Sequence, residues 1–220
     1  MKKNNNKYII TLFFFLLLFF IILKDIFQYE ITTYDNWAYN IFVKDLRSNN
    51  MTTFMKIITS FGGGLFLISL LIVLFVTIKD KMIGLFASAN LVVIYLLNHL
   101  VKAIVQRPRP SGYNLINESF YSFPSGHSMI STAFYGFIIY LVYKKINNRV
   151  LKYSIIFLLF NLIILICVSR IYLGVHYLSD TLAGFALSMV YLMSLAYIIP
   201  YLKGKINYES KGRKKEKKKI

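Results

Sequence analysis

The stretch MIGLFASANLVVIYLLNHLV, residues 82–101, contains no Asp, Glu, Lys or Arg. A helix of about 20 apolar residues crosses the hydrocarbon core of a bilayer, so this stretch predicts a membrane-spanning helix. With 57% hydrophobic residues among 220, the chain is too apolar for a soluble domain of this length. We therefore predict an all-α polytopic membrane protein, a bundle of six transmembrane helices. The other five apolar runs lie at residues 8–23, 65–78, 128–143, 151–168 and 181–201.

The net charge of +17 is unevenly distributed along the chain. An even number of spans places both termini on one side of the membrane, together with the connections after the second and fourth spans. Connections rich in Lys and Arg stay in the cytoplasm, so both termini are expected there, in the plasma membrane of a cell. Eighteen of the 26 Lys and Arg fall on this side: Lys2, Lys3, Lys7, Lys79, Lys81, Lys144, Lys145, Arg149, Lys152 and nine between residues 203 and 219.

The two ends of the chain have simple interpretations. Residues 202–220 are expected to form a disordered basic tail that contacts anionic lipid headgroups, beyond a membrane domain at residues 1–201. No recognition module accompanies the tail, which argues against nucleic-acid binding. The N-terminal run resembles a signal peptide, but Lys24 and Asp25 follow it in place of a cleavage site, so we expect the first span to be retained. Cys167, the only cysteine, excludes a disulfide within one chain.

The outward side has two long segments, residues 24–64 and 102–127, and a short turn at 169–180. The first contains apolar residues at helical spacing and predicts a short interfacial helix that packs over the bundle. These residues are Tyr34, Trp37, Ala38, Ile41 and Phe42. The three glycines at 62–64 lack the Lys and Ser or Thr of a nucleotide-binding loop, so they predict a flexible connection to the second span.

Three clusters of ionisable residues lie near the outward ends of spans three to six. Lys and Arg side chains bind phosphate oxygens, and the free N–H groups at a helix start form an anion site. A carboxylate four residues after a histidine can orient the imidazole if the segment is helical. Taken singly, the clusters also fit membrane anchoring and helix capping. The clusters are Lys102 with Arg109-Pro110; Pro124-Ser125-Gly126-His127; and Ser169-Arg170 with His176 and Asp180.

Only one of the two motif histidines, His176, has a carboxylate four residues later, namely Asp180. The carboxylate can accept a hydrogen bond from one ring nitrogen and leave the other nitrogen free to attack. His176 is therefore the predicted nucleophile.

Together the clusters resemble the type 2 phosphatidic acid phosphatase family, whose signature reads K-x6-RP, PSGH and SR-x5-H-x3-D. Arg107-Pro108 also reads RP, but only Arg109 stands at the family's spacing from Lys102. The resemblance implies a membrane lipid phosphatase in which His176, held by Asp180, attacks phosphorus to form a phosphohistidine. It also implies that His127 protonates the leaving oxygen and then activates water. The phosphate-binding residues implied by the family are Lys102, Arg109, Ser125, Gly126 and Arg170.

Neither a cofactor nor a metal ion is expected. The motifs offer two histidines and one aspartate among fixed cations, with no cluster of hard oxygen ligands for a divalent ion. Glu118, the only acid between the first two clusters, is expected to be solvated in a loop, and His99 to be a core or interface residue.

The substrate is expected to be a phospholipid or polyprenyl pyrophosphate within the bilayer. Among undecaprenyl pyrophosphate, phosphatidylglycerophosphate, phosphatidic acid and diacylglycerol pyrophosphate, we favour the first, because its phosphates remain on the outer membrane face. A phosphotransferase acting on a second lipid, and a non-enzymatic transport or scaffold protein, remain open alternatives. Vanadate-dependent haloperoxidases share the signature, but they resemble soluble proteins, so the six predicted spans argue against this class. The sequence makes no prediction of an oligomeric state.

Overall fold

The computed structural model describes residues 5–77 and 81–216, and these ranges contain helices and no strand, which confirms the all-α prediction. Within the described ranges each of the six apolar runs lies in a helix, because a helix satisfies its own backbone polar groups in lipid. Residue 78, the last of the second run, lies outside these ranges. The elements are α1 (Asn5–Tyr29), α2 (Thr33–Tyr39), the π-helix η2 (Asn40–Asp45), α3 (Asn49–Ser60), α4 (Gly64–Thr77), α5 (Lys81–Val105), α6 (Gly126–Lys145), α7 (Arg149–Tyr172) and α8 (Leu178–Glu216).

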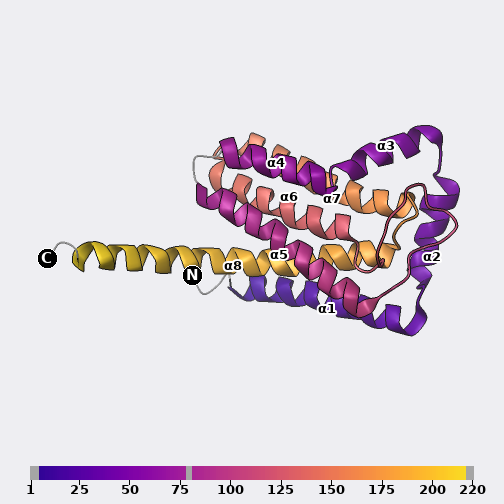
Figure 1. Ribbon diagram of the computed structural model, residues 1–220, viewed down its shortest axis with the longest axis horizontal. Helices are drawn as coiled ribbons and strands as arrows, with labels where there is room; N and C mark the ends of the chain where they lie inside the picture. The colour runs from indigo at the N-terminus through magenta and orange to yellow at the C-terminus, as the bar shows by residue number, and fades with distance from the viewer. Residues whose placement is uncertain (1–4, 78–80, 217–220) are drawn as a thin grey trace.

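The long helices form a bundle with α6 at its centre (Figure 1). Helix α6 packs against α5, α7 and α8, while α1 lies alongside α8. Helix α8 projects from the bundle on the side where α1 begins, and α2 crosses the opposite end (Figure 1). The core around α6 is closely packed: Phe134 and Ile166 are fully buried in one cluster, and a Cβ on Gly136 would lie 2.4 Å from Leu192.

The structure does not confirm the count of six spans. Four helices of the described ranges, α1, α5, α7 and α8, are long and apolar enough to cross a membrane, and α3 with α4 adds a fifth if this pair, bent by 47°, crosses as one span. Helix α4 alone has 14 residues, fewer than a crossing requires. Helix α6 has 20 residues, but its first turns carry the polar side chains of Ser128, Ser131 and Thr132, which are buried inside the bundle. Six spans therefore remain a prediction.

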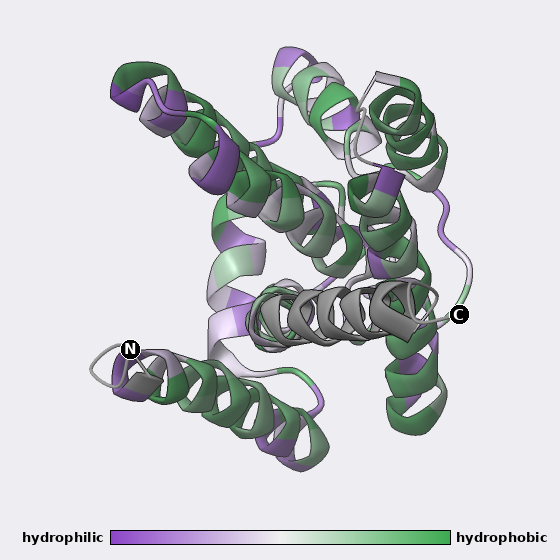
Figure 2. Cartoon of the chain, turned by 90° about the vertical axis from the view of Figure 1, so that its left-hand side faces the viewer, coloured by the Kyte–Doolittle hydropathy of each residue, from purple (hydrophilic) through white to green (hydrophobic). Residues whose placement is uncertain are grey.

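The outer surface of the bundle is apolar. Hydrophobic residues dominate the helices in Figure 2, and many large ones are exposed, including Leu65, Val76 and Phe157. Extended apolar surfaces of this kind are rare on soluble monomers and are expected where lipid tails are the solvent.

The predicted short helix between the first two spans is present as α2, continued by η2. Thr32 caps α2 in a capping box with Asp35, and Ala38 is buried while Trp37 is exposed. The following segment is tied to the end of α7, because Arg47 donates to the Tyr172 carbonyl at 2.9 Å and the Ser48 N–H donates to the Tyr172 hydroxyl at 3.1 Å. We refer to α2, η2 and α3 as the cap. Its position at a membrane interface remains a prediction.

Helix α8 continues to Glu216 and so includes most of the expected tail, whose disorder remains a prediction. Lys, Arg and Glu are good helix formers, which accounts for the continuation. Residues 217–220 lie outside the described ranges, as do Lys2, Lys3 and Lys79.

Candidate active site

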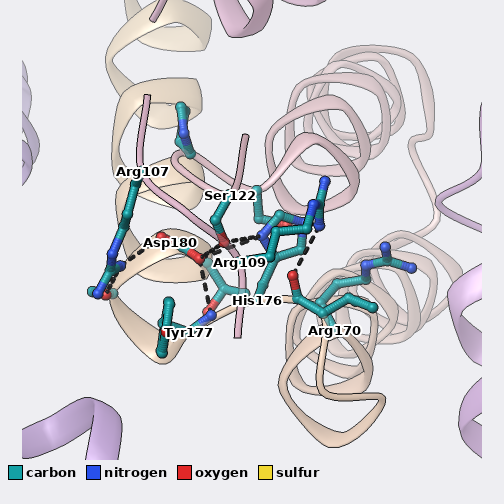
Figure 3. A network of polar contacts seen from close by, with 12 residues as sticks. Arg107, Arg109, Ser122, Arg170, His176, Tyr177 and Asp180 are labelled. Atoms are coloured by element: carbon teal, nitrogen blue, oxygen red, sulfur yellow. Dashed lines mark hydrogen bonds and ion pairs between the residues drawn. The ribbon is translucent and has the colours of Figure 1, made fainter. Parts of the chain in front are cut away.

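The three clusters converge at the end of the bundle that α2 crosses. The first lies at the end of α5 and in the loop that follows, the second at the start of α6, and the third at the end of α7 and the start of α8. Figure 3 shows Arg109, Arg170, His176 and Asp180 around one centre.

His176 lies in the turn between α7 and α8, and 3% of its surface is exposed. Its Nδ1 is 3.4 Å from Asp180 Oδ2, as the four-residue spacing predicted. However, α8 begins only at Leu178, so the premise of a helix from residue 176 was wrong. Asp180 instead caps the helix start, because its Oδ2 accepts the Tyr177 N–H at 2.9 Å while it faces the imidazole.

Ser122 completes the contacts of this pair. Its hydroxyl lies 3.3 Å from His176 Nδ1 and donates to Asp180 Oδ2 at 2.5 Å. Ser122 was not among the predicted site residues, because it stands two residues before the PSGH motif and has no distinctive spacing. A hydroxyl that donates to the carboxylate helps to fix the oxygen that faces the ring.

Arg109 extends from the loop after α5 to the opposite nitrogen of His176. Its Nη1 lies 3.1 Å from Nε2 and donates to the Val175 carbonyl at 2.8 Å. An arginine can only donate, so Nε2 carries the lone pair and Nδ1 carries the proton that faces Asp180. The pKa of His176 is lowered from 6.5 to about 3 by burial, against the raising effect of Asp180 and with a further lowering by Arg109 and Arg170. The imidazole is therefore neutral at physiological pH, the state that a nucleophile requires.

Arg170, at the end of α7, is 1% exposed. It donates to Thr59 of α3 at 2.8 Å and pairs with Glu118. Its Nε is buried and lacks a partner among the residues that the structure describes. An unpaired buried donor costs free energy, so this atom is suited to an anion's oxygen.

Glu118 is not the solvated loop residue that we expected. Its carboxylate contacts Arg170 through Oε1, and Oε2 lies 3.9 Å from Arg109 Nη2, with 26% of the side chain exposed. The sequence prediction was wrong because the loop folds back over the site. Glu118, the only acid of the loop, there contacts the guanidinium groups of Arg170 and Arg109.

Lys102 and His127 lie close to the same centre. Lys102 is buried in the last turns of α5, and its Nζ donates to the Tyr121 carbonyl. His127 precedes the apolar run of α6, and its pKa is lowered by burial and then by the charges of Arg170, His176, Arg109 and Lys102. Bound phosphate would counter these cations and favour protonation of His127.

Ser125 and Gly126 form the start of α6. The Ser125 side chain is fully buried and accepts the Ser128 N–H at 3.4 Å as an N-cap, and its backbone N–H donates to the Asp180 carbonyl at 3.1 Å. A Cβ on Gly126 would lie 3.2 Å from the Asn98 side-chain oxygen. The Ser125 hydroxyl thus caps the start of α6. The phosphate-binding role that the family implies for Ser125 and Gly126 remains a prediction.

Arg107, which was not predicted as a site residue, contacts Asp180 directly. Its guanidinium lies 2.7 Å from Asp180 Oδ1 and 2.9 Å from Asp35 Oδ2, on the side of Asp180 away from His176 (Figure 3). The repeated Arg-Pro pair at residues 107–110 could have indicated a role for Arg107. The spacing of the family signature assigned only the second pair, Arg109-Pro110, to the site.

No group of three or more His, Cys, Asp or Glu that could hold a metal ion occurs within residues 5–77 and 81–216. Metal independence remains a prediction that needs a measurement.

The fold and the site define a helical membrane protein with a buried histidine–aspartate pair inside a cradle of Lys and Arg side chains. The sequence profile of the PAP2 superfamily matches residues 66–203, more than half of the chain. The chain belongs to this superfamily, which confirms the resemblance seen in its motifs.

Individual relatives support the same grouping. Phosphatidylglycerophosphatase B of Bacillus subtilis (strain 168) is 30% identical over 96 residues, which span 43% of this chain and 47%, about half, of that protein. The crystal structure of a transmembrane PAP2-type phosphatidylglycerolphosphate phosphatase from Bacillus subtilis matches with a TM-score of 0.78 and 28% identity, covering 89% of this chain and 97% of that one. Aquifex aeolicus LpxE, at 23% identity and a TM-score of 0.57 over 74% of this chain and 93% of its own, is similar in fold.

Proposed function

We propose that this protein is a membrane lipid phosphatase that removes a phosphoryl group from a lipid headgroup through a phosphohistidine on His176. The observation that carries the proposal is the geometry of one imidazole. Its Nδ1 faces the Asp180 carboxylate at 3.4 Å, and its Nε2, with the lone pair, points to the guanidinium of Arg109 at 3.1 Å. This lone pair opens onto the cationic cradle, and it becomes free to attack when a bound phosphate takes the Arg109 donor onto its own oxygens.

The reaction proceeds in two displacements. In the first, His176 Nε2 attacks phosphorus, the bond from phosphorus to the lipid oxygen breaks, and His127 gives its proton to that oxygen. In the second, water attacks the phosphohistidine, His127 takes the water proton, and the bond from phosphorus to nitrogen breaks. Arg109, Arg170 and Lys102 stabilise the charge on the equatorial phosphate oxygens in both steps.

Phosphatidylglycerophosphate is the substrate best supported by the comparisons, since the Bacillus subtilis sequence and crystal structure that match this chain carry this activity in their names. Undecaprenyl pyrophosphate, which we favoured from the sequence, has no such support among them and becomes the second candidate. Both lipids present a phosphate at headgroup depth.

The site is proposed to face outward in the plasma membrane, with both termini in the cytoplasm. The positive charges near the termini and in the connections after α4 and α6 support this orientation.

Phosphate release from each lipid in mixed micelles tests the proposal. We expect wild type to release phosphate from phosphatidylglycerophosphate in the presence of EDTA, and His176→Ala to release none. Equal rates for the two proteins would remove the nucleophile, and loss of wild-type activity in EDTA would refute the metal-free mechanism. Phosphorylation of a second lipid instead of release would identify a phosphotransferase, and no reaction with any lipid would favour the transport or scaffold alternative.

A further inference from the structure

A second buried ionic cluster joins the motif residue Asp180 to two residues outside the motifs, Arg107 and Asp35. Arg107, from the loop after α5, lies between two carboxylates, Asp35 of α2 and Asp180 of α8. The side chains of all three are at most 2% exposed. Buried charges are costly unless they are paired and hydrogen-bonded, so a cluster of this kind requires a reason.

The hydrogen bonds of Arg107 fix it in one orientation. Its Nη1 donates to Asp180 Oδ1 at 2.7 Å and to the Ser179 hydroxyl at 2.6 Å. Its Nη2 donates to Asp35 Oδ2 at 2.9 Å and to the Glu30 carbonyl at 2.5 Å. The guanidinium also lies 4.1 Å from the centre of the Tyr177 ring.

These contacts distinguish Arg107 from the cations that we expect to bind phosphate. Both Nη groups are engaged with protein oxygens, so the pair of donors that would grip phosphate is already occupied. Its Nε is buried and has no partner among the residues that the structure describes. Figure 3 places Arg107 and His176 on opposite sides of Asp180. The pKa of Arg107 is raised because the charges of Asp180 and Asp35 outweigh the lowering effect of burial.

The two oxygens of Asp180 have different partners. Oδ1 contacts Arg107, whereas Oδ2 faces His176, Ser122 and the Tyr177 N–H. A carboxylate held at both oxygens cannot rotate, so the oxygen that faces the imidazole is fixed. Arg107 is in turn held by Asp35, which also accepts the Ser179 N–H at 2.8 Å.

We propose that Arg107 is a positioning residue: held by Asp35 of the cap, it locks the Asp180 carboxylate and so orients His176 for attack on phosphorus. The inference rests on the proposed function, because it concerns the same histidine. It gives the cap a role in the reaction although no cap residue need touch the substrate.

Steady-state kinetics of Arg107→Gln, Arg107→Lys, Asp35→Asn and the double variant Asp35→Asn/Arg107→Gln test the inference. We expect Arg107→Gln to lower kcat about 100-fold, the scale of a small misplacement of a reacting group. The KM and the inhibition constant for inorganic phosphate should change less than about threefold, because Arg109, Arg170 and Lys102 remain in place. Arg107→Lys should recover part of kcat, since it restores the charge without the fork.

The double variant should be no slower than Arg107→Gln, because both residues act on Asp180 along one path. Arg149→Gln, an exposed arginine at the start of α7, is the matched control and should behave as wild type. Thermal unfolding in detergent checks that each variant is folded.

Three results would overturn the inference. One is an unchanged kcat in Arg107→Gln, and another is a loss of phosphate inhibition as large as the loss of kcat, which would make Arg107 a phosphate ligand. If Arg107→Gln does not fold, an unchanged kcat in both Arg107→Lys and Asp35→Asn would equally overturn it. If wild type itself releases no phosphate from any lipid, the proposed function fails and the positioning role fails with it. If wild type is active and Arg107→Gln has the same kcat, only the positioning role fails.

Discussion

Glu118 is positioned to compete with phosphate for two guanidinium groups of the candidate site. Its carboxylate pairs with Arg170 and lies 3.9 Å from Arg109, the residues that we expect to bind phosphate oxygens. We expect Glu118→Gln to strengthen competitive inhibition by inorganic phosphate about threefold to tenfold, because a competing negative charge is removed. Asp45→Asn, at an exposed acid on η2, should have no such effect. Weaker inhibition in Glu118→Gln would show that Glu118 organises the cradle rather than competing for it.

The lowered pKa of His176 predicts how stability depends on pH. The folded value is about 3 and the ordinary value is 6.5, so between these limits the unfolded chain binds more protons than the folded one. Stability from this group is complete above pH 6.5 and decreases as pH falls, by up to about 1.4 kcal/mol per pH unit. Thermal unfolding in detergent between pH 7.5 and 4.5 should therefore show a shallower decline for His176→Asn than for wild type. His127 contributes in the same direction, so part of the decline should persist. Identical pH profiles for the two proteins would contradict the assignment.

At the scale of single residues, spacing decided which contacts could be predicted. That His176, Asp180 and Arg109 lie together could be predicted, because a fixed interval links each to a partner of complementary chemistry. Arg107 and Asp35 could not, since their pairing joins positions 72 residues apart, and only the fold brings these together. Glu118 was misread for the same reason, because an acid in a loop predicts solvation unless the loop returns to buried cations.

Among the connecting elements, the turn between α3 and α4 has a steric requirement beside the site. A Cβ on Gly62 would lie 2.8 Å from the Ile166 side chain and 3.3 Å from His127 Cδ2. We expect Gly62→Ala to displace one of these neighbours, to cost about 1–3 kcal/mol of stability and to lower kcat through His127. A Cβ on Gly64 would meet no atom within 4 Å, so Gly64→Ala is the matched control. Unfolding midpoints and kcat for both variants measure the effect, and an unaltered Gly62→Ala would show that the turn tolerates a side chain.

Apolar runs predicted where helices lie but not their ends. The run at 151–168 lies inside α7, which extends over Arg149–Tyr172 because Asn148 caps its start and Leu173 ends it. Helix α6 was predicted as a span, and its first turns carry buried polar side chains, as expected where a helix is surrounded by protein rather than by lipid. Of the cap, only a short interfacial helix around residues 34–42 was predicted, while the contacts of the cap with the site were not apparent from periodicity.

At the scale of the whole molecule, the arrangement predicts sidedness. In a Cys167→Ala background, Ser111→Cys lies in the loop after α5 at the site end, and Asn147→Cys lies in the exposed connection between α6 and α7. A membrane-impermeant maleimide applied to intact cells should label position 111 and not position 147, because the basic connections are expected in the cytoplasm. After cell lysis both positions should be labelled. Labelling of position 147 alone in intact cells would invert the proposed orientation.

The central claim is that a lipid phosphoryl group passes through the imidazole of His176, and its most direct test is capture of that intermediate. Purified protein is mixed with lipid carrying a radiolabelled phosphate, quenched in alkali within milliseconds, and mapped by peptide mass spectrometry, since phosphohistidine survives base and is lost in acid. The mechanism predicts label on His176 in wild type and none in His176→Ala. The His127→Ala variant should carry more label than wild type if the change slows hydrolysis of the phosphohistidine more than its formation. Label on another residue, or phosphate release by His176→Ala at the wild-type rate, would contradict it.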